Sequence, residues 1–166
     1  MAAALDYADF VERYGGIYER SPWVAERCFE RQAGELAPFE LLKLLERCVD
    51  EADRDSKLDL IRAHPDLAGK AAVRGELTAE SNTEQASAGI DQCTPDEFAE
   101  FQLLNNRYRD KFGFPFVMAV RGSNRQDILA AFALRLENDY ETEFETAIRE
   151  IHKIARLRLE AMSERR

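Results

Sequence analysis

Residues 94–113 read TPDEFAEFQLLNNRYRDKFG and carry the signals for both ends of one helix. Thr94 and Glu97 have capping-box spacing, in which each side chain bonds a free backbone N–H of the first turn. Pro95 suits the first helical position, because its missing N–H would be unpaired there anyway. Gly113 is typical of a helix end, since glycine adopts the left-handed backbone conformation without strain. The sequence therefore predicts a helix that begins after Thr94 and ends at Gly113.

On both sides of this stretch, apolar residues recur at the helical period, and few segments alternate as a half-buried strand would. Further helices are predicted at residues 21–34, with Ser21 as the cap and Pro22 as the first helical residue, and at residues 38–52, 56–63, 126–137 and 143–162. No internal repeat, low-complexity tract or linker rich in Gly, Pro or Ser divides the chain. We expect an all-α fold, a single compact domain over residues 1–166 with about eight helices.

The composition fits a folded domain and excludes several classes of protein. The chain has 166 residues, 45% of them hydrophobic and 33% charged, which suits a packed core under a solvated surface. With 32 acidic against 23 basic residues the net charge is -9, so a partner nucleic acid is not expected. One buried cation could still select an anionic small molecule inside such a protein.

The chain shows no sign of export or of a membrane partner. Its first ten residues contain acids and no basic cluster, unlike a signal peptide, and no apolar run approaches the roughly 20 residues that span a bilayer. The three cysteines are widely spaced without a CxxC pattern, which indicates neither a disulfide framework nor a zinc knot. We expect a cytoplasmic protein.

Residues 112–120, FGFPFVMAV, break the helical pattern. They are apolar, contain glycine and proline, and have no helical stripe, which predicts a short buried extended segment near residues 114–120 or a turn that fills the core. If the segment is extended, its backbone N–H and C=O groups need partners. A polar ligand could supply them, but side chains or water are the more common solution.

Only two histidines occur, and their settings differ. His64 stands at a helix break, because a residue before proline is disfavoured in the helical conformation. Pro65 could then open a further short helix, with Asp66 at its positive end. His64 is a candidate catalytic group facing a cleft, and the plainer alternative is a surface or capping histidine. His152, beside charged neighbours in the last helix, is expected to be solvated, and two isolated histidines argue against a zinc site.

The polar run Ser81-Asn82-Thr83-Glu84-Gln85 allows two interpretations. Ser81 and Glu84 have capping-box spacing, so the residue types alone favour a purely structural helix start. In the functional alternative, Ser81, Glu84 and Gln85 form a polar corner at a helix N-terminus, where free N–H groups meet an anion or a urea group. The amide of Gln85 offers both a donor and an acceptor to such a ligand.

Arg158 is anomalous, because it lies on the apolar stripe of the last helix. That stripe comprises Phe144, Ile148, Ile151, Ala155 and Met162. A buried arginine must be paired, either with an internal acid or with the carboxylate of a substrate, unless it reaches the surface near the helix end. Arg121 and Arg135 are further candidates for an anion site, and the sequence does not decide among the three.

Several motifs together resemble the OHCU decarboxylase family, in full 2-oxo-4-hydroxy-4-carboxy-5-ureidoimidazoline decarboxylase. They are HPDLAGK at residues 64–70, Ser81-x-x-Glu84-Gln85 with Ala88-Gly89, Asn105-x-x-Tyr108-x-x-Lys111 running into FGFPF at 112–116, and the ending IARLRL at 154–159. Each motif alone is weak, but their order and the chain length make the combination specific, and the resemblance spans essentially the whole chain.

The resemblance implies a helical homodimer that acts without metal or organic cofactor. It implies a lyase that decarboxylates a small ureidoimidazoline substrate to (S)-allantoin in urate degradation, a branch of purine metabolism. It assigns His64 as the general acid and Glu84 as the residue that orients the substrate. The substrate-binding residues that it implies are Pro65, Ser81, Asn82, Thr83, Glu84, Gln85, Phe116, Val117, Met118, Ala119, Val120 and Arg158.

Two rival functions remain open at this point. One is a helical interaction module, which would expose residues 114–120 as a partner groove and leave His64 incidental. The other is a hydrolase that acts on a related ureide, with His64 and Glu84 activating a water molecule and no release of CO2.

Overall fold

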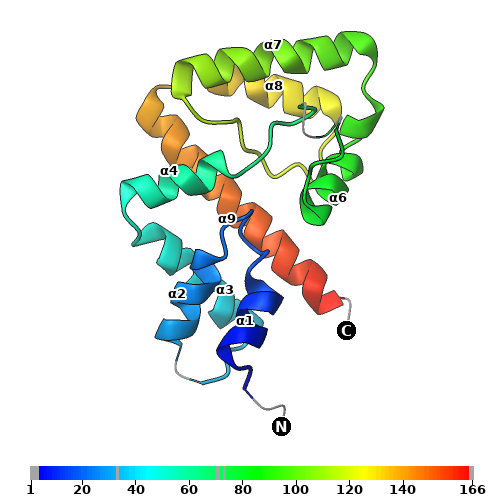
Figure 1. The fold of residues 1–166 in the computed structure, drawn as a ribbon. Coiled ribbons are helices and arrows are strands. Elements are labelled where there is room, and N and C mark those ends of the chain that lie inside the picture. The colour runs from blue at the N-terminus through cyan, green and yellow to red at the C-terminus, as the bar shows by residue number, and fades with distance from the viewer. Residues whose placement is uncertain (1–3, 33, 70–71, 73, 165–166) are drawn as a thin grey trace. The chain divides into compact units, whose positions relative to one another are not determined.

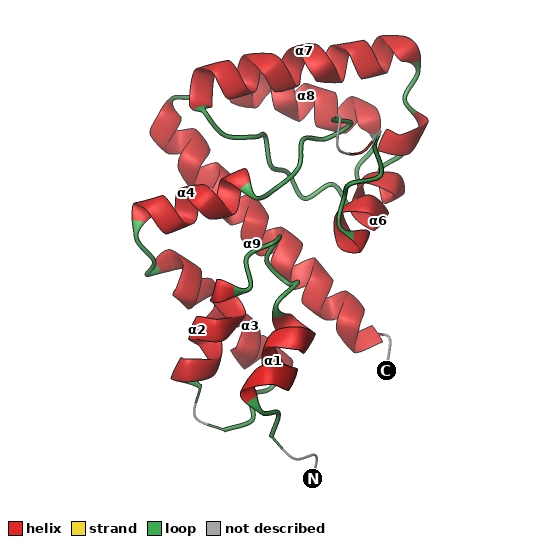
Figure 2. Cartoon of the chain, viewed as in Figure 1, coloured by secondary structure: helices red, strands yellow, loops and turns green. Residues whose placement is uncertain are grey.

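The structure is a computed structural model that describes residues 4–32, 34–69, 72 and 74–164. Within them the regular structure consists of eight α-helices and one short 3-10 helix, without a strand (Figures 1 and 2). The elements are α1 (Tyr7–Tyr14), α2 (Trp23–Arg31), α3 (Pro38–Asp50), α4 (Arg54–Arg62), α6 (Ala79–Ser87), η1 (Ile90–Gln92), α7 (Pro95–Phe112), α8 (Arg125–Leu136) and α9 (Tyr140–Glu164). The expected all-α class is confirmed.

The helix predicted from residues 94–113 is α7, and its ends are confirmed. The Thr94 hydroxyl accepts from the N–H of Glu97 at 3.1 Å, and the Glu97 carboxylate accepts from the N–H of Thr94 at 3.0 Å. Gly113 ends the helix with a φ of 74°, in the left-handed region that favours glycine. Both ends of α7 are therefore set by residues within the helix and its immediate flanks.

Two details of the N-terminal helices differ from expectation. Ser21 does not cap α2, because its hydroxyl donates to the carbonyl of Glu19 at 2.8 Å, and Pro22 holds the cap position instead. The helix ends at Arg31, before the predicted Gly34. The sequence reasoning also missed α1, which Asp6 caps by accepting from the N–H of Asp9 at 2.9 Å.

The chain divides into two compact units, each with its own buried side chains. Unit 1 runs up to Ala63 and resumes at His152, and unit 2 comprises His64–Ile151. In unit 1, α2 contacts both α1 and α3. In unit 2, α7 and α8 lie side by side (Figure 1).

An aromatic cluster holds unit 2 together. The ring of Tyr108 on α7 lies 4.5 Å from Phe112 and 5.4 Å from Phe116, between ring centroids. Phe116 stacks on Phe132 of α8 at 3.9 Å, with the two planes only 9° apart. Phe116 belongs to the segment after α7, so the cluster fixes that segment against α7 and α8.

Unit 1 contains a buried ion pair. The Arg158 guanidinium lies 2.7 Å from the Glu19 carboxylate and also donates to the carbonyl of Gly16 at 3.1 Å. The side chains of Arg158 and Glu19 are only 6% and 1% exposed. Of the alternatives left open for Arg158, the structure shows an internal acid, and the route to the surface is wrong.

His152 is not solvated, which corrects the expectation from its charged neighbours. Its Nδ1 lies 2.8 Å from the Tyr18 hydroxyl and its Nε2 lies 2.9 Å from Asp50, and its side chain is 15% exposed. One signal could have shown this, because His152 follows the buried Ile148 by four residues and so shares its helix face.

Replacing Arg158 with methionine is expected to lower the free energy of unfolding by about 3–5 kcal/mol, since it removes one partner of a buried pair. Arg156→Met is the matched control on the same helix: Arg156 is 57% exposed, and its loss should change stability by less than about 0.5 kcal/mol. Urea unfolding followed by circular dichroism measures both. Equal effects of the two substitutions would contradict this role of the pair.

Candidate active site

His64 follows α4 directly and is buried, with 6% of its surface exposed. This excludes the alternative of a surface histidine. No helix begins at Pro65: residues 65–69 form an irregular turn, so the expectation of a further short helix there is wrong. Ala68 in this turn has a φ of 52°, in the left-handed region, which a continuing helix does not contain.

The carbonyls of residues 66–68 accept hydrogen bonds from side-chain amides instead of from a helix. This stretch, which we call the 66–68 turn, receives three such bonds on three successive residues. They run from Gln85 Nε2 to the Asp66 carbonyl at 3.3 Å, from Asn105 Nδ2 to the Leu67 carbonyl at 2.9 Å, and from Gln102 Nε2 to the Ala68 carbonyl at 2.6 Å. The Ala68 N–H in turn donates to Gln85 Oε1 at 3.2 Å. Helices α6 and α7 thus fix the backbone that follows His64.

The polar run from Ser81 to Gln85 begins inside the first turn of α6, and Ser81 is not the N-cap of this helix. Thr78 caps α6, with its hydroxyl accepting from the N–H of Ser81 at 3.2 Å. The capping-box interpretation of Ser81 and Glu84 is therefore wrong: Thr78, three residues earlier, supplies the capping oxygen, and this start places Ser81 and Gln85 on one buried face.

The remaining residues of the run do not share that face. Asn82 and Thr83 are exposed, and the Thr83 hydroxyl bonds the carbonyl of Ala79 at 2.9 Å. Glu84 is half-buried. Of the five predicted residues of this run, the structure therefore gathers Ser81 and Gln85 on the buried face and leaves Glu84 at its margin.

The segment after α7 is largely buried and not helical, as predicted, and residues 114–120 form no strand. Phe114 and Phe116 are 0% and 1% exposed. Side chains hold its backbone: Arg135 Nη1 donates to the Val117 carbonyl at 2.7 Å, and the Ala119 N–H donates to the Glu150 carboxylate at 3.3 Å. The burial of this segment contradicts the rival interaction module, which required an exposed patch there.

Arg135 is paired with Glu143, a carboxylate that is fully buried. Its Nη2 lies 2.9 Å from Glu143, and its guanidinium lies over the ring of Phe116, 4.3 Å from the centroid. Asn138 and the Tyr108 hydroxyl donate to the same carboxylate. Burial, and then this hydrogen bond to Glu143, raise the pKa of Tyr108, so the phenol stays protonated at neutral pH and donates its hydrogen bond to Glu143.

The predicted site residues are divided between the two units. His64, Pro65, the run on α6 and residues 116–120 belong to unit 2, whereas Arg158 belongs to unit 1, where it pairs with Glu19. Arg121 is exposed, in the turn after Val120. Arg135 and Arg158 therefore each have a carboxylate of the protein as a partner.

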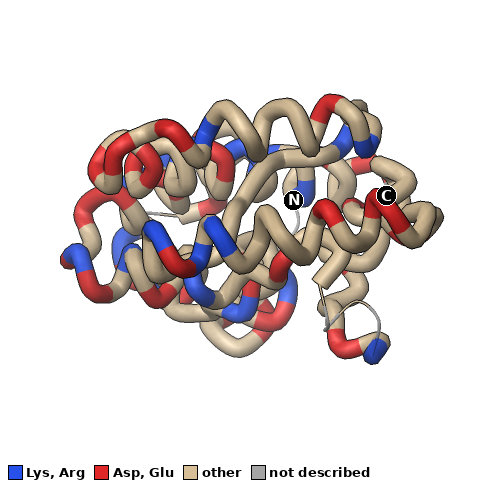
Figure 3. Tube along the Cα trace, turned by 90° about the horizontal axis from the view of Figure 1, so that it is seen from above, with Lys and Arg blue, Asp and Glu red and all other residues tan. Residues whose placement is uncertain are grey.

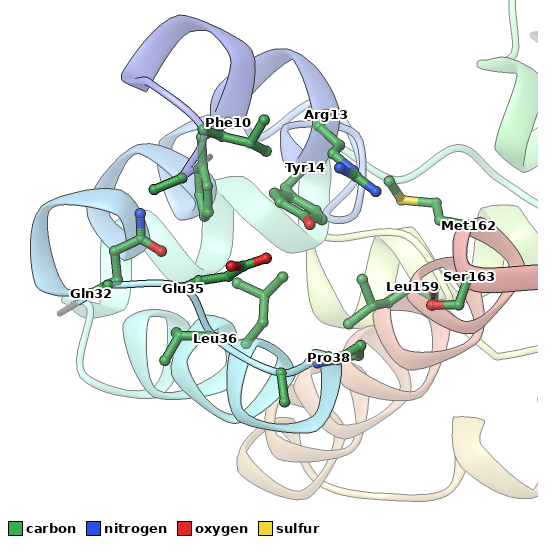
Figure 4. Close-up of a pocket in the computed structure, with 15 residues that line it drawn as sticks. Phe10, Arg13, Tyr14, Gln32, Glu35, Leu36, Pro38, Leu159, Met162 and Ser163 are labelled. Atoms are coloured by element: carbon green, nitrogen blue, oxygen red, sulfur yellow. Dashed lines mark hydrogen bonds between the residues drawn. The ribbon is translucent and has the colours of Figure 1, made fainter. Parts of the chain in front are cut away.

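A cavity of about 650 Å³ lies in unit 1, lined by α1, the residues before α3 and the last turns of α9 (Figure 4). Phe10 and Tyr14 lie on one side of it, and Leu159 and Met162 on another. Its lining residues include none of the residues that the sequence analysis named as a site. The predicted substrate pocket is therefore not this cavity.

Charges of both signs are interspersed along the chain (Figure 3). Among the described residues, no cluster of three or more His, Cys, Asp or Glu side chains is arranged to hold a metal ion. None of the described helices is both long and apolar enough to cross a membrane.

Sequence reasoning missed Gln102 as a residue that supports the site. Gln102 precedes Asn105 by three residues on α7, so both side chains project from neighbouring turns of one face. The signal available in the sequence was two amides flanking the apolar stripe of Phe101, Leu104 and Tyr108.

Substituting Arg135 with methionine should destabilise the protein by about 3–5 kcal/mol, because the buried Glu143 then loses its cation. Arg121→Met serves as the comparison, since an exposed side chain in a turn should change stability by no more than about 0.5 kcal/mol. Unfolding in urea gives both values. A stability of Arg135→Met close to that of Arg121→Met would show that the Glu143 network does not support the fold.

Known proteins are similar to this chain along most of its length. The model of the OHCU decarboxylase family matches residues 3–160. The 2-oxo-4-hydroxy-4-carboxy-5-ureidoimidazoline decarboxylase of Haloferax volcanii is 46% identical over 159 residues, covering 93% of this chain and 89% of that protein. The uric acid degradation bifunctional protein PucL of Bacillus subtilis is 42% identical over 159 residues, covering 93% of this chain and 30% of that longer protein.

A crystal structure of (S)-allantoin synthase has a similar fold, with a TM-score of 0.75 and 32% identity, covering 95% of this chain and 50% of that one. This similarity in structure agrees with the match to the family model over residues 3–160. Together with the identity to the Haloferax volcanii protein, it shows that the chain belongs to the OHCU decarboxylase family.

Proposed function

We propose that this protein is a cofactor-independent carboxy-lyase that converts 2-oxo-4-hydroxy-4-carboxy-5-ureidoimidazoline to (S)-allantoin in urate degradation. Family membership supports this activity, and so do the names of the similar proteins. The single observation that carries the proposal is the setting of His64, which is buried and followed by a backbone that two helices hold in place.

The chemistry of the substrate explains why no cofactor is required. When the carbon–carbon bond to the carboxylate breaks, CO2 leaves and the electron pair stays on a ring carbon beside a C=N bond. The substrate therefore contains its own electron sink, which other decarboxylases obtain from a cofactor. The protein has to orient the carboxylate, polarise the ring and deliver one proton to one face of that carbon.

His64 is the proposed donor of that proton. A proton added from a single side gives a single enantiomer, so the donor must be held in one position relative to the ring. Pro65 supports such a role, because it fixes its own φ and restricts the conformation of His64 before it. Burial of His64 supports it further, since a water-exposed carbanion would be protonated from either face.

The residues of α6 have two proposed roles. Glu84, half-buried beside Ser81, would orient the hydroxyl or the ureido group of the substrate. Gln85 already uses its Oε1 and one Nε2 hydrogen on the 66–68 turn, so among the proposed substrate-binding residues we assign it mainly to shaping the pocket. Ser81 is proposed to complete the buried part of this side of the pocket, and the exposed Asn82 and Thr83 are proposed to lie at its rim.

The segment 116–120 is proposed as a backbone wall of the pocket. Two of its groups, the Val117 carbonyl and the Ala119 N–H, already pair with side chains of unit 2. These bonds fix the segment, and its other backbone groups would then meet the polar edges of the substrate. Arg158 is the proposed cation for the leaving carboxylate, with its guanidinium oriented by Glu19. The protein is further proposed to act as a cytoplasmic homodimer.

Changing His64 to asparagine should reduce the acceleration of substrate decay by about 100- to 10,000-fold, because it removes the general acid. The substrate is generated in the cuvette from urate by a urate oxidase with a hydrolase, and the circular dichroism of the allantoin formed is followed. We expect the optical signal to approach that of a racemate while the far-ultraviolet spectrum of the variant stays helical.

The second histidine provides the control. His152→Asn removes an imidazole from unit 1 and should keep the wild-type rate and enantiomeric excess. Wild-type behaviour of His64→Asn would contradict the assignment of the proton donor. Turnover without release of CO2 would instead support the rival hydrolase.

A further inference from the structure

We propose that Gln102 and Asn105 of α7 are positioning residues for His64: they hold the 66–68 turn and thereby set the direction of the imidazole. The inference rests on the proposed function, because it gives His64 the role of proton donor. It extends that function to two side chains that donate hydrogen bonds to the backbone carbonyls of Ala68 and Leu67.

The carbonyls that accept from α7 belong to buried residues, and of the two donors Asn105 is buried and Gln102 is half-buried. Asn105 is 3% exposed, and the residues whose carbonyls accept, Leu67 and Ala68, are 6% and 4% exposed. Hydrogen bonds in such surroundings are stronger than those in water, and a carbonyl that loses its donor there has no ready replacement. Removal of either amide should therefore change the conformation of the turn.

The conformation of Ala68 is a second, independent observation. Its φ of 52° is one that residues other than glycine rarely adopt, and it persists only where the surroundings hold it. Gln85 bonds the N–H of Ala68 and Gln102 bonds its carbonyl, so side chains from two helices fix both sides of this residue. Because the φ of Ala68 is unfavourable, we expect the turn to change its conformation when one of these hydrogen bonds is removed.

The 66–68 turn is close enough in the chain to control His64. Only Pro65 separates His64 from the first bonded carbonyl, that of Asp66. Because the ring of Pro65 fixes its φ, little freedom remains between the two residues. The carboxylate of Asp66 is also bound, by Arg109 Nε at 3.0 Å and Nη2 at 2.9 Å. Few freely rotating backbone bonds lie between the turn and His64, so a shift of the turn should also move His64.

Misplacement of a catalytic group by about 1 Å can cost a hundredfold in rate. Gln102→Met, which keeps the length of the side chain and removes the donor, should lower kcat about tenfold to a hundredfold. KM should change much less, since neither amide is assigned to the substrate. The enantiomeric excess of allantoin should also fall, which a general loss of folded protein would not cause.

The kinetic test uses purified full-length protein and the coupled urate assay. Asn106→Ala is the matched control, because Asn106 is an exposed neighbour of Asn105 on α7 and should leave kcat and enantiomeric excess at wild-type values. If Gln102→Met does not fold, Gln102→Glu, which keeps the shape and removes the N–H donor, is measured in its place.

A spectroscopic test reports on the imidazole without any turnover. The chain has two histidines, so protein labelled with 15N-histidine gives two sets of ring signals, and His64→Asn identifies which set belongs to His64. In Gln102→Met the His64 signals should shift or broaden. The His152 signals, which arise in unit 1, should stay unchanged.

Lower kcat and lower enantiomeric excess together with altered His64 signals support the proposal. Wild-type kinetics of the variant, or unchanged His64 signals, overturn it. Failure of the proposed function would be recognised separately, because His64→Asn would then keep the wild-type rate and enantiomeric excess, whatever happens in Gln102→Met.

Discussion

Buried backbone outside a helix has to find hydrogen-bond partners, and unit 2 depends on how this requirement is met. Two of its largely buried stretches are irregular, the 66–68 turn and residues 114–120. The turn is held by amide side chains of α6 and α7, and the second stretch by Arg135 and Glu150. The helices of this unit thus act as rigid carriers of side chains whose partners are backbone atoms.

This arrangement suits the proposed reaction, in which the protein mainly has to orient the substrate and hold one proton donor in place. Side chains bound to backbone fix the path of the chain, and the chain then fixes the proposed proton donor His64 at one stretch and the proposed backbone wall of the pocket at the other. The Arg135–Glu143 pair also helps to hold the segment after α7. The Arg135 guanidinium, which pairs with Glu143, donates to the Val117 carbonyl and lies over the Phe116 ring. Irregular backbone can therefore be as well defined as the helices around it.

Local signals in the sequence predicted both ends of α7 correctly, but they misplaced the ends of α2 and predicted a helix at Pro65 that does not form. They also failed where residues distant in the sequence determine the structure. The ends of α7 depend on Thr94, Glu97 and Gly113, all within or beside the helix. Thr78 and Ser81 are both residue types that cap helices, and the sequence does not show that α6 begins after Thr78 and leaves Ser81 buried within its first turn. The sequence showed that Arg158 needs a partner, but Glu19 lies 139 residues away, beyond the reach of any spacing rule.

The central claim, that side chains hold the irregular backbone of unit 2, can be tested on the unmodified protein by amide hydrogen exchange measured by NMR. The N–H groups of Ala68 and Ala119 both donate to side-chain oxygens, of Gln85 and Glu150. We expect both amides to exchange slowly, with protection close to that of the middle of α7, although neither lies in a helix. Exchange of these two amides at the rate of an unstructured chain would contradict the claim.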